Sequence, residues 1–176
     1  CFTDQNIIAM IEIKNVTKSF EGKTILHDIS ATFHTGKTNL IIGQSGSGKT
    51  VLMKSIVGLL HPESGQILYD GKDLLQMSGA QVKALRSGML FQGSALFDSL
   101  TVIENVMFPL KMFTRKSLAE RIKRAEFCLD RVNLKGANDL FPSEISGGMQ
   151  KRVAIARAIA LNPKYLFCDE PNSGLD

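Results

Sequence analysis

The 176-residue sequence lacks the features that mark several classes of protein. No apolar run approaches the roughly 20 residues that a membrane-spanning helix needs, and residues 1–6 have neither the basic region nor the long apolar run of a secretory signal. The cysteines and histidines do not have the spacing of metal ligands, and the odd number of cysteines fits a reducing compartment. We therefore expect a soluble, cytoplasmic protein without a zinc site. The cysteines and histidines are Cys1, Cys128, Cys168, His27, His34 and His61.

Charge of one sign is not concentrated in any part of the chain. Lys and Arg number 21 against 17 Asp and Glu, a net charge of +4, but no basic tract is interleaved with aromatic residues. We therefore expect no nucleic-acid partner. Hydrophobic residues make up 44% of the sequence, which is enough for one well-filled core and not obviously for two.

The most informative segment is a glycine-rich run that follows the apolar residues 40–42 and opens into an apolar helical pattern. Glycine lets the backbone adopt conformations closed to other residues and lets N–H groups approach phosphate oxygens. Lys49 supplies a point charge for the β- and γ-phosphates, and Thr50 supplies a hydroxyl for Mg²⁺. The start of the helix directs its positive end at the same anion. The pattern predicts a nucleoside triphosphate site formed by Gly43, Gln44, Ser45, Gly46, Ser47, Gly48, Lys49 and Thr50.

This predicted site ends at Thr50. The next residue is Val51, which begins the apolar helical pattern and has no hydroxyl group. No threonine at position 51 is therefore counted among the ATP-binding residues, and Thr50 is the one that we expect to serve Mg²⁺.

The first half of the chain reads mostly as strands. Alternating apolar residues predict strands at 11–16 and 24–33, joined by a turn at 21–23. A further strand at Lys37–Ile42 is expected to lead into the phosphate loop, with a helix from Gly48 to about Leu60 and a strand at 66–70 after it. We expect a domain that begins at Met10, so that residues 1–9 are an added leader.

The second half has a different character. Thr101 and Ser117 each begin a capping-box pattern, which predicts two helices. The second of these should pack an apolar face that includes Leu118, Ala125 and Leu129. Another helix is expected at 149–161, and short buried strands at 89–91 and 164–168. These expectations describe a helical insertion at about 93–161 in an α/β core.

Two acidic residues follow the last of these strands. A carboxylate at a strand end can reach a Mg²⁺ ion beside a phosphate loop, so Asp169 is the expected metal-side residue. Glu170 is then placed to act as the general base on the attacking water. Ser146, Gly147 and Gly148 open a helix and form a second anion-receptive helix end. The alternative for Ser146 is a simple helix cap with a flexible lead-in.

Taken together, the order of these motifs resembles the nucleotide-binding subunit of an ATP-binding-cassette (ABC) transporter, over 10–176. The resemblance implies an α/β fold, with a RecA-like P-loop NTPase core, antiparallel N-terminal strands and a helical subdomain, and it implies ATP and Mg²⁺ as cofactors. It also implies that Phe20 stacks on adenine and that Gln92 senses Mg²⁺ and the γ-phosphate. Residues 173–176 would touch a partner subunit. The implied catalytic residues are Glu170, Gln92 and Lys49, and the implied metal-side residues are Thr50, Gln92 and Asp169.

The same resemblance explains the second anion-receptive helix end. In this family two subunits pack head to tail, so Ser146, Gly147 and Gly148 would contact ATP held by the other copy. Ile145 and Met149 depart from the residues usual beside this signature without removing a phosphate-facing group. The family pattern continues with further core strands and a histidine beyond position 176, so we expect the domain at 10–176 to be incomplete at its C-terminus and a poor ATPase by itself.

The segment 90–106, with 108–110 after it, resembles most closely the ATPases of Mla-type phospholipid-trafficking systems. Such ATPases work with an integral membrane permease and an MCE-domain lipid-binding protein, on the cytoplasmic face of the inner membrane. Leu96, Phe97 and Leu100 are expected either to receive a helix of the permease or to pack the helical subdomain. The alternatives are a transporter ATPase for another substrate, as in lipoprotein release or amino acid import, and a soluble ABC protein acting on the ribosome or DNA.

Overall fold

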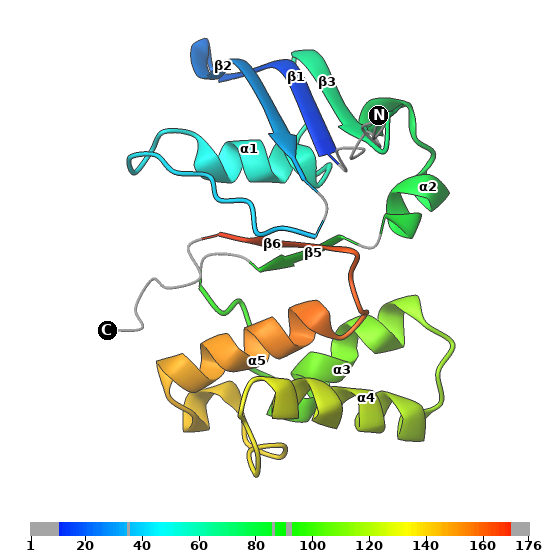
Figure 1. Ribbon diagram of the computed structural model, residues 1–176. Helices are drawn as coiled ribbons and strands as arrows, with labels where there is room; N and C mark the ends of the chain where they lie inside the picture. The colour runs from blue at the N-terminus through cyan, green and yellow to red at the C-terminus, as the bar shows by residue number, and fades with distance from the viewer. Residues whose placement is uncertain (1–10, 35, 86, 91–92, 170–176) are drawn as a thin grey trace, which may run out of the picture. The chain divides into compact units, whose positions relative to one another are not determined.

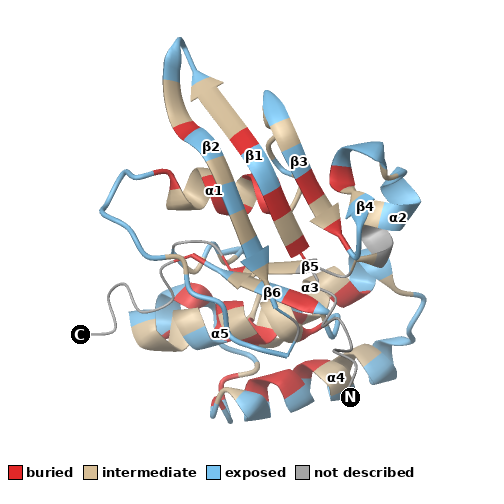
Figure 2. Cartoon of the chain, turned by 45° about the horizontal axis from the view of Figure 1, so that its top comes forward, coloured by how far each residue is buried: buried red, intermediate tan, exposed pale blue. Residues whose placement is uncertain are grey.

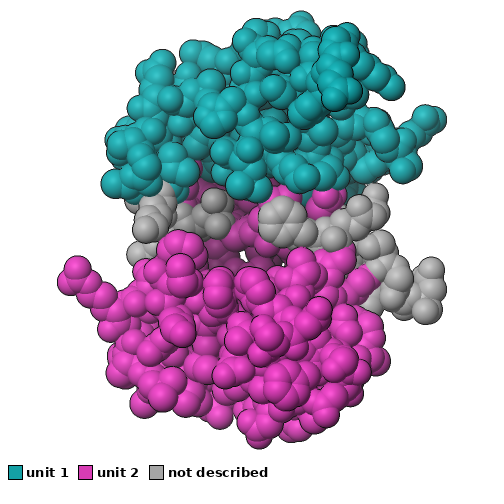
Figure 3. Space-filling view, turned by 180° about the vertical axis from the view of Figure 1, so that it is seen from behind, with its two compact units in different colours: residues 1–84 teal, residues 85–176 magenta. Residues whose placement is uncertain are grey.

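The computed structural model describes residues 11–34, 36–85, 87–90 and 93–169 (Figure 1). The chain divides into two compact units, Cys1–Ala84 and Leu85–Asp176, which are coloured separately in Figure 3. The expected leader at 1–9 lies outside the described residues, and the expected bounds of the domain and of its helical subdomain stay predictions.

The first unit is built on an antiparallel sheet with the strand order β2-β1-β3-β4 (Figure 1). The strands are β1 (Ile11–Phe20), β2 (Lys23–Phe33), β3 (Ser64–Tyr69) and β4 (Lys72–Asp73). Strands β1 and β2 form a hairpin whose two turn residues, Glu21 and Gly22, have φ angles of 49° and 79°. Positive φ at both positions gives the turn the twist that a tight hairpin requires. The expected N-terminal antiparallel strands are therefore confirmed.

One face of this sheet packs on helix α1 (Lys49–Ile56) (Figure 2). Ile11 and Ile13 are buried by simple alternation along β1, but the next buried residue is Val16, three positions further. A bulge at Asn15, where φ is 53°, shifts the pairing register and returns Val16 to the buried face. Tyr69 closes the layer because its buried hydroxyl donates a hydrogen bond to the Ile56 carbonyl at 2.8 Å.

Two expectations for this unit differ from the structure. Residues 37–42 do not form a strand, and Leu40 and Ile42 are 78% and 85% exposed. A strand needs neighbours that accept its backbone hydrogen bonds, and in the described part of the chain neither sheet includes this segment. Helix α1 ends at Ile56 and not near Leu60, because Gly58 adopts a φ of 81° and the chain turns there.

The second unit contains a parallel pair of strands and three packed helices. Strand β5 (Ser87–Leu90) pairs with β6 (Tyr165–Cys168), so that Leu90 lies opposite Cys168. The helices are α3 (Val102–Phe113), α4 (Leu118–Arg131) and α5 (Gly147–Ile159). Shorter elements of the chain are the 3₁₀ turns η1 (Leu74–Gln76) and η2 (Pro142–Glu144) and the helix α2 (Gly79–Ala84). Gly88 is needed because a Cβ there would lie 2.9 Å from the Ala158 carbonyl oxygen.

The helices share one core, which includes Val102, Leu110, Cys128, Leu129 and Val153. Both predicted capping boxes are present, at Thr101 with Glu104 and at Ser117 with Glu120. Leu118 was expected on the packed face of its helix but is 57% exposed, because it is the first residue of α4. Among the described helices, none is long and apolar enough to cross a membrane.

Candidate nucleotide-binding site

The phosphate loop connects β2 and residues 34–42 to helix α1. Three of its glycines are needed for different reasons. Gly46 and Gly48 have φ angles of 76° and 92°, which residues with a side chain rarely adopt. A Cβ at Gly48 would also lie 3.0 Å from side-chain carbons of both Ile25 and Leu26. At Gly43 a Cβ would lie only 2.6 Å from the Ser47 hydroxyl oxygen.

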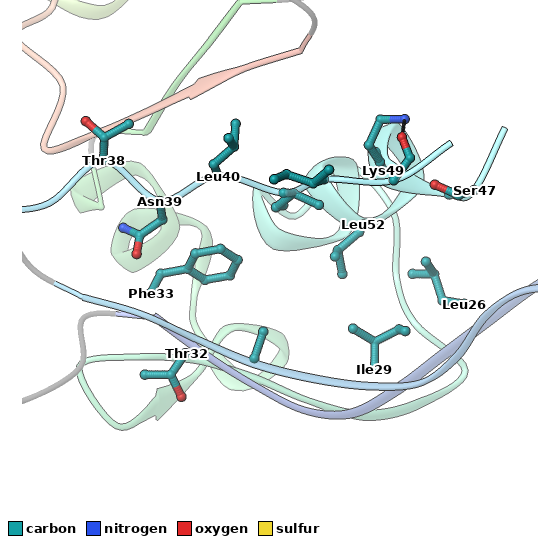
Figure 4. Close-up of a pocket in the computed structure, with 15 residues that line it drawn as sticks. Leu26, Ile29, Thr32, Phe33, Thr38, Asn39, Leu40, Ser47, Lys49 and Leu52 are labelled. Atoms are coloured by element: carbon teal, nitrogen blue, oxygen red, sulfur yellow. Dashed lines mark hydrogen bonds between the residues drawn. The ribbon is translucent and has the colours of Figure 1, made fainter. Parts of the chain in front are cut away.

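Lys49, in the first turn of α1, is folded over this loop. Its Nζ donates hydrogen bonds of 2.8 Å to the carbonyl oxygens of both Gly43 and Gln44 (Figure 4). The Ser47 N–H donates to the Gln44 oxygen at 3.2 Å and tightens the same turn. The ammonium group is therefore held at the loop, next to Thr50, which is the following residue of α1.

Val51 comes after Thr50 in α1 and is partly buried. Its carbonyl oxygen accepts a hydrogen bond from the Ser55 hydroxyl at 2.9 Å, within the helix. Position 51 is a valine and not a second threonine. The Val51 side chain has no oxygen to offer to a metal or a phosphate, so position 51 is not part of the site. The hydroxyl for Mg²⁺ stays assigned to Thr50 as a prediction.

The start of α1 has the properties of an anion site. Gly48 is the N-cap residue, and no acidic residue lies in the first turn of the helix. Residues 43–47 are exposed, so their backbone is accessible to a ligand. Amide groups and the positive end of the helix dipole then face the same exposed loop. These properties are those of a polyphosphate site, and the assignment of residues 43–50 to ATP stays a prediction.

A pocket of about 690 Å³ lies behind the loop, between β2 and residues 38–43. Leu26, Ile29 and Phe33 of β2 converge on it with Leu52 of α1 (Figure 4). Its lining is mixed, because Ser47 and Lys49 of the phosphate loop border it together with these apolar side chains.

Phe20 lies at the end of β1, in the same unit as the loop. The residue is 42% exposed, and the Nζ of Lys18 lies 5.3 Å from the centroid of its ring. The exposed ring offers a face for stacking, so contact between Phe20 and adenine stays a prediction.

The second unit contains the helix end that the sequence singled out. Ser146 is the N-cap of α5, and its Oγ accepts a hydrogen bond from the Met149 N–H at 3.3 Å. Ser146 is thus a helix cap, which was the simpler alternative. Packing does not require glycine at Gly147 or Gly148, because outside their own helix no atom of the described residues lies within 4 Å of a Cβ added at either position.

Asp169 follows β6 directly and is only 5% exposed. Its N–H donates to the Leu90 carbonyl at 2.9 Å, which extends the pairing of β6 with β5 by one residue. The carboxyl group is therefore held at the carboxyl end of this strand pair. Gln92, Glu170 and residues 173–176 lie outside the described residues, so their expected roles stay predictions.

Sequence reasoning missed a buried asparagine that shapes the segment after Gln92. Asn105 is fully buried in α3, and its Oδ1 accepts a hydrogen bond from the Phe97 N–H at 2.9 Å. Its Nδ2 donates to the carbonyls of Phe97, Leu100 and Thr101 at 3.1, 3.0 and 3.0 Å. The available signal was a polar residue beside the apolar stripe of this helix, at Val102 and Val106.

Arg157 of α5 was missed as well. Its Nη2 donates to the carbonyls of Ser94 and Ala95 at 3.1 and 2.9 Å, and its guanidinium carbon lies 5.7 Å from the centroid of the Phe97 ring. Burial lowers the pKa of this guanidinium below its ordinary value. The other neighbour of the Phe97 ring is Phe108, at a centroid distance of 4.6 Å.

The three apolar residues of this segment have different environments. Leu96 packs against the helical core, whereas Phe97 remains 42% exposed and Leu100 is partly buried. Packing of the helical subdomain therefore accounts for Leu96, and Phe97 is available for contact with a partner.

Comparison with known proteins matches a family model to the part of the chain that contains these motifs. The family model described as "ABC transporter" matches residues 26–173, which include the phosphate loop, the start of α5 and Asp169. The chain belongs to the ABC transporter ATP-binding family. An α/β cassette with an antiparallel N-terminal sheet is the fold expected of that family, and the solved structures that resemble this ABC chain are also ABC cassettes.

Curated relatives of this ABC chain are named as ATP-binding proteins of transport systems. The probable ribonucleotide transport ATP-binding protein mkl of Mycobacterium leprae is 44% identical over 94% of this chain and 48% of its own length. The intermembrane phospholipid transport system ATP-binding protein MlaF of Haemophilus influenzae is 42% identical over 95% of this chain and 64% of its own length. The chain thus spans about half of the first relative and less than two thirds of the second.

A solved structure similar to this ABC chain is a dimeric, post-hydrolysis state of the ATP-binding cassette MJ0796 bound to ADP and Pi. It has a TM-score of 0.86 and 34% sequence identity, and the match covers 95% of this chain and 76% of that one.

Proposed function

We propose that this chain is the ATP-binding and ATP-hydrolysing part of a transporter subunit that powers phospholipid movement through a separate membrane permease. The observation that carries the proposal is the phosphate loop, in which Gly48 opens α1 with a φ of 92° and Lys49 is held against the loop. Membership of the ABC family and the transport names of the relatives support the coupling to transport.

When ATP binds, Lys49 changes its hydrogen-bond acceptors. Its ammonium exchanges two neutral carbonyl acceptors for charged phosphate oxygens, which form stronger hydrogen bonds. Thr50 and Asp169 offer hydroxyl and carboxylate oxygens, the donor types that suit Mg²⁺. When bound, Mg²⁺ neutralises charge on the β- and γ-phosphates.

Hydrolysis is assigned to residues beyond the described part of the chain. Glu170 polarises the attacking water as general base, and Gln92 senses Mg²⁺ and the γ-phosphate. Replacing Glu170 by Gln in the full-length subunit should abolish turnover and retain ATP, as measured by phosphate release and by filter binding. Normal phosphate release from Glu170→Gln would remove this residue from the catalytic role.

The working unit is a head-to-tail homodimer. In it, ATP on the loop of one copy meets Ser146, Gly147 and Gly148 of the other copy. The open space around both glycines supports this arrangement, because packing among the residues that the structure describes in one copy does not require glycine there. The similarity to a dimeric cassette bound to ADP and Pi supports it as well.

The transported substrate is the finer part of the proposal. MlaF of Haemophilus influenzae is named for intermembrane phospholipid transport, and mkl of Mycobacterium leprae for ribonucleotide transport. We favour phospholipid because segment 90–106 resembles the Mla-type ATPases, and the mkl name makes ribonucleotide the second candidate. The partners are then an integral permease and an MCE-domain lipid-binding protein, with the subunit on the cytoplasmic face of the inner membrane.

Copurification tests the class of function. The full-length subunit, isolated from its native membranes in mild detergent, should carry a permease that mass spectrometry identifies. Association with ribosomes or DNA, without a permease, would contradict the transporter assignment.

Reconstitution then tests the substrate. The purified complex in proteoliposomes should transfer labelled phospholipid when ATP is supplied, and the same complex with Lys49→Ala should not. ATP-dependent uptake of a labelled ribonucleotide, without phospholipid transfer, would favour the second candidate.

A further inference from the structure

The turn that joins α3 to α4 carries three exposed, large apolar side chains (Figure 1). Met112 and Phe113, at the end of α3, are each 58% exposed, and Leu118, the first residue of α4, is 57% exposed. Single exposed apolar residues are common on protein surfaces, but three of them so close along the chain form a local cluster. We call the residues from the first to the last of these three the 112–118 turn.

Positive charge gathers around the same turn. Charge of one sign was not expected to concentrate in any part of the chain, yet residues 111–123 hold five Lys or Arg side chains and one Glu. Their net charge of +4 equals the net charge of the whole chain, because the basic and acidic residues elsewhere balance. Lys111, Arg115 and Lys116 are exposed, and the carboxylate of the one acidic residue, Glu120, is engaged in the capping box of α4. The apolar cluster is therefore surrounded by exposed positive charge.

The 112–118 turn is held in one shape by local hydrogen bonds. The Thr114 hydroxyl donates to the Leu110 carbonyl at 2.6 Å and accepts a hydrogen bond from the Lys116 N–H at 3.4 Å. The capping box at Ser117 fixes the start of α4, and Leu110 and Leu129 anchor the two helices in the shared core. A turn that is already ordered loses little conformational freedom on binding, so its exposed side chains form a preorganised surface.

The chemistry of this surface favours an anionic lipid layer over a protein or a nucleic acid. Three side chains of this size and exposure offer roughly 350 Å² together, whereas a stable protein interface buries about 800 Å² on each partner. Methionine and leucine do not stack on nucleobases as aromatic rings do, so a nucleic acid would leave most of the cluster uncovered. A bilayer needs no matching pocket, because its anionic headgroups attract Lys and Arg and the boundary below them accepts apolar side chains.

We propose that the 112–118 turn docks on a membrane surface that contains anionic phospholipid. The three apolar side chains enter the interfacial layer, and the exposed basic side chains around them pair with headgroup phosphates. This contact goes beyond the proposed function, because it holds the subunit on lipid directly and not only through a permease. It requires neither ATP nor a particular transported substrate.

Vesicle co-sedimentation of the full-length subunit, purified without its permease, tests this contact. The probes are vesicles of phosphatidylcholine alone and vesicles that also contain phosphatidylglycerol, which carries negative charge. The wild type should bind the anionic vesicles at least about tenfold more tightly, and added salt should weaken that binding. Met112→Ser combined with Leu118→Ser should lower the affinity at least about tenfold, and Lys116→Glu at least about fivefold.

The first unit offers matched controls for these variants. Leu59 and Leu75 are 57% and 44% exposed, and Lys72 is exposed as well. Leu59→Ser combined with Leu75→Ser, and Lys72→Glu, make the same chemical changes away from the 112–118 turn and should keep the wild-type affinity. Because the substituted side chains are exposed in every variant, each should fold, as circular dichroism will check.

The outcomes decide between lipid and the other partners. Equal binding to both kinds of vesicle, or a loss in the controls as large as in the turn variants, would overturn the lipid contact. Binding that Lys116→Glu weakens and Met112→Ser with Leu118→Ser does not would overturn it too, because the attraction would then be charge alone. Tighter binding to poly-glutamate or duplex DNA than to anionic vesicles, lost in the same variants, would assign the surface to a protein or a nucleic acid.

These outcomes are separate from those that test the proposed function. A subunit that ignores anionic vesicles can still copurify with a permease, and such a result would overturn the lipid contact alone. A subunit that binds anionic vesicles through the 112–118 turn but carries no permease would contradict the proposed function alone.

Discussion

At the scale of the residue, Gly46 and Gly48 share a left-handed backbone but not the same surroundings. Their φ angles are 76° and 92°, yet a Cβ would meet open space at Gly46 and carbons of Ile25 and Leu26 at 3.0 Å at Gly48. Gly46→Ala should destabilise the protein by about 1 kcal/mol and Gly48→Ala by about 2–3 kcal/mol, since only the second adds crowding to strain. Urea unfolding of both variants measures the difference, and equal losses would contradict this account of Gly48.

The second prediction at this scale concerns Lys49. Lys49→Ala should weaken ATP binding by about 100-fold, the effect of losing charge-assisted hydrogen bonds to phosphate. Lys54→Ala, a lysine in the last turn of the same helix, should bind ATP as the wild type does. Isothermal titration with ATP provides the comparison, and similar affinities for the two variants would count against the assignment of the loop.

At the scale of the element, the capping box at the start of α4 affects the ionisation of the Glu120 carboxyl group. The Ser117 hydroxyl and N–H donate to the Glu120 carboxylate, both at 2.8 Å, and these bonds lower the pKa of Glu120. A depressed pKa in the folded state contributes stability above the unfolded-state pKa, and that contribution is lost as the pH falls through the folded-state pKa.

Ser117→Ala removes one of these donors. The pKa of Glu120 should therefore rise toward its ordinary value, and the stability lost relative to the wild type should shrink as the solution is acidified. Thr101→Ala, which disrupts the equivalent box at α3, should leave the pKa of Glu120 unchanged. NMR titration of the Glu120 carboxyl carbon measures this, and an unchanged pKa in Ser117→Ala would show that the hydroxyl is not the cause.

At this scale the sequence predicted those features whose interacting residues lie close together along the chain. The capping boxes at Thr101 and Ser117 were predicted because both partners lie within four residues. The strand at 37–42 was wrong because a strand also depends on neighbours that local sequence does not contain. Arg157 was missed because its partners, Ser94 and Ala95, are 63 and 62 residues away along the chain.

At the scale of the whole molecule, the proposed function makes this chain one half of a composite site. The phosphate loop belongs to the first unit and the start of α5 to the second, and each has its own local explanation except for Gly147 and Gly148. The loop could be predicted from its pattern because glycine, lysine and threonine act within eight residues. The role of the two glycines could not be predicted from local pattern alone, because the group proposed to need them belongs to another copy of the chain.

ATP-dependent dimerisation tests this central claim most directly. Sedimentation velocity of full-length Glu170→Gln should show a dimer only when ATP is present. Adding Gly147→Asp to that variant should leave ATP binding intact, because beyond its own helix no described atom of the same copy lies within 4 Å of the new Cβ. The added carboxylate would face the partner's phosphates, so the dimer should weaken by at least about tenfold. An unchanged dimer in Gly147→Asp, or a dimer that forms equally without ATP, would contradict the composite site.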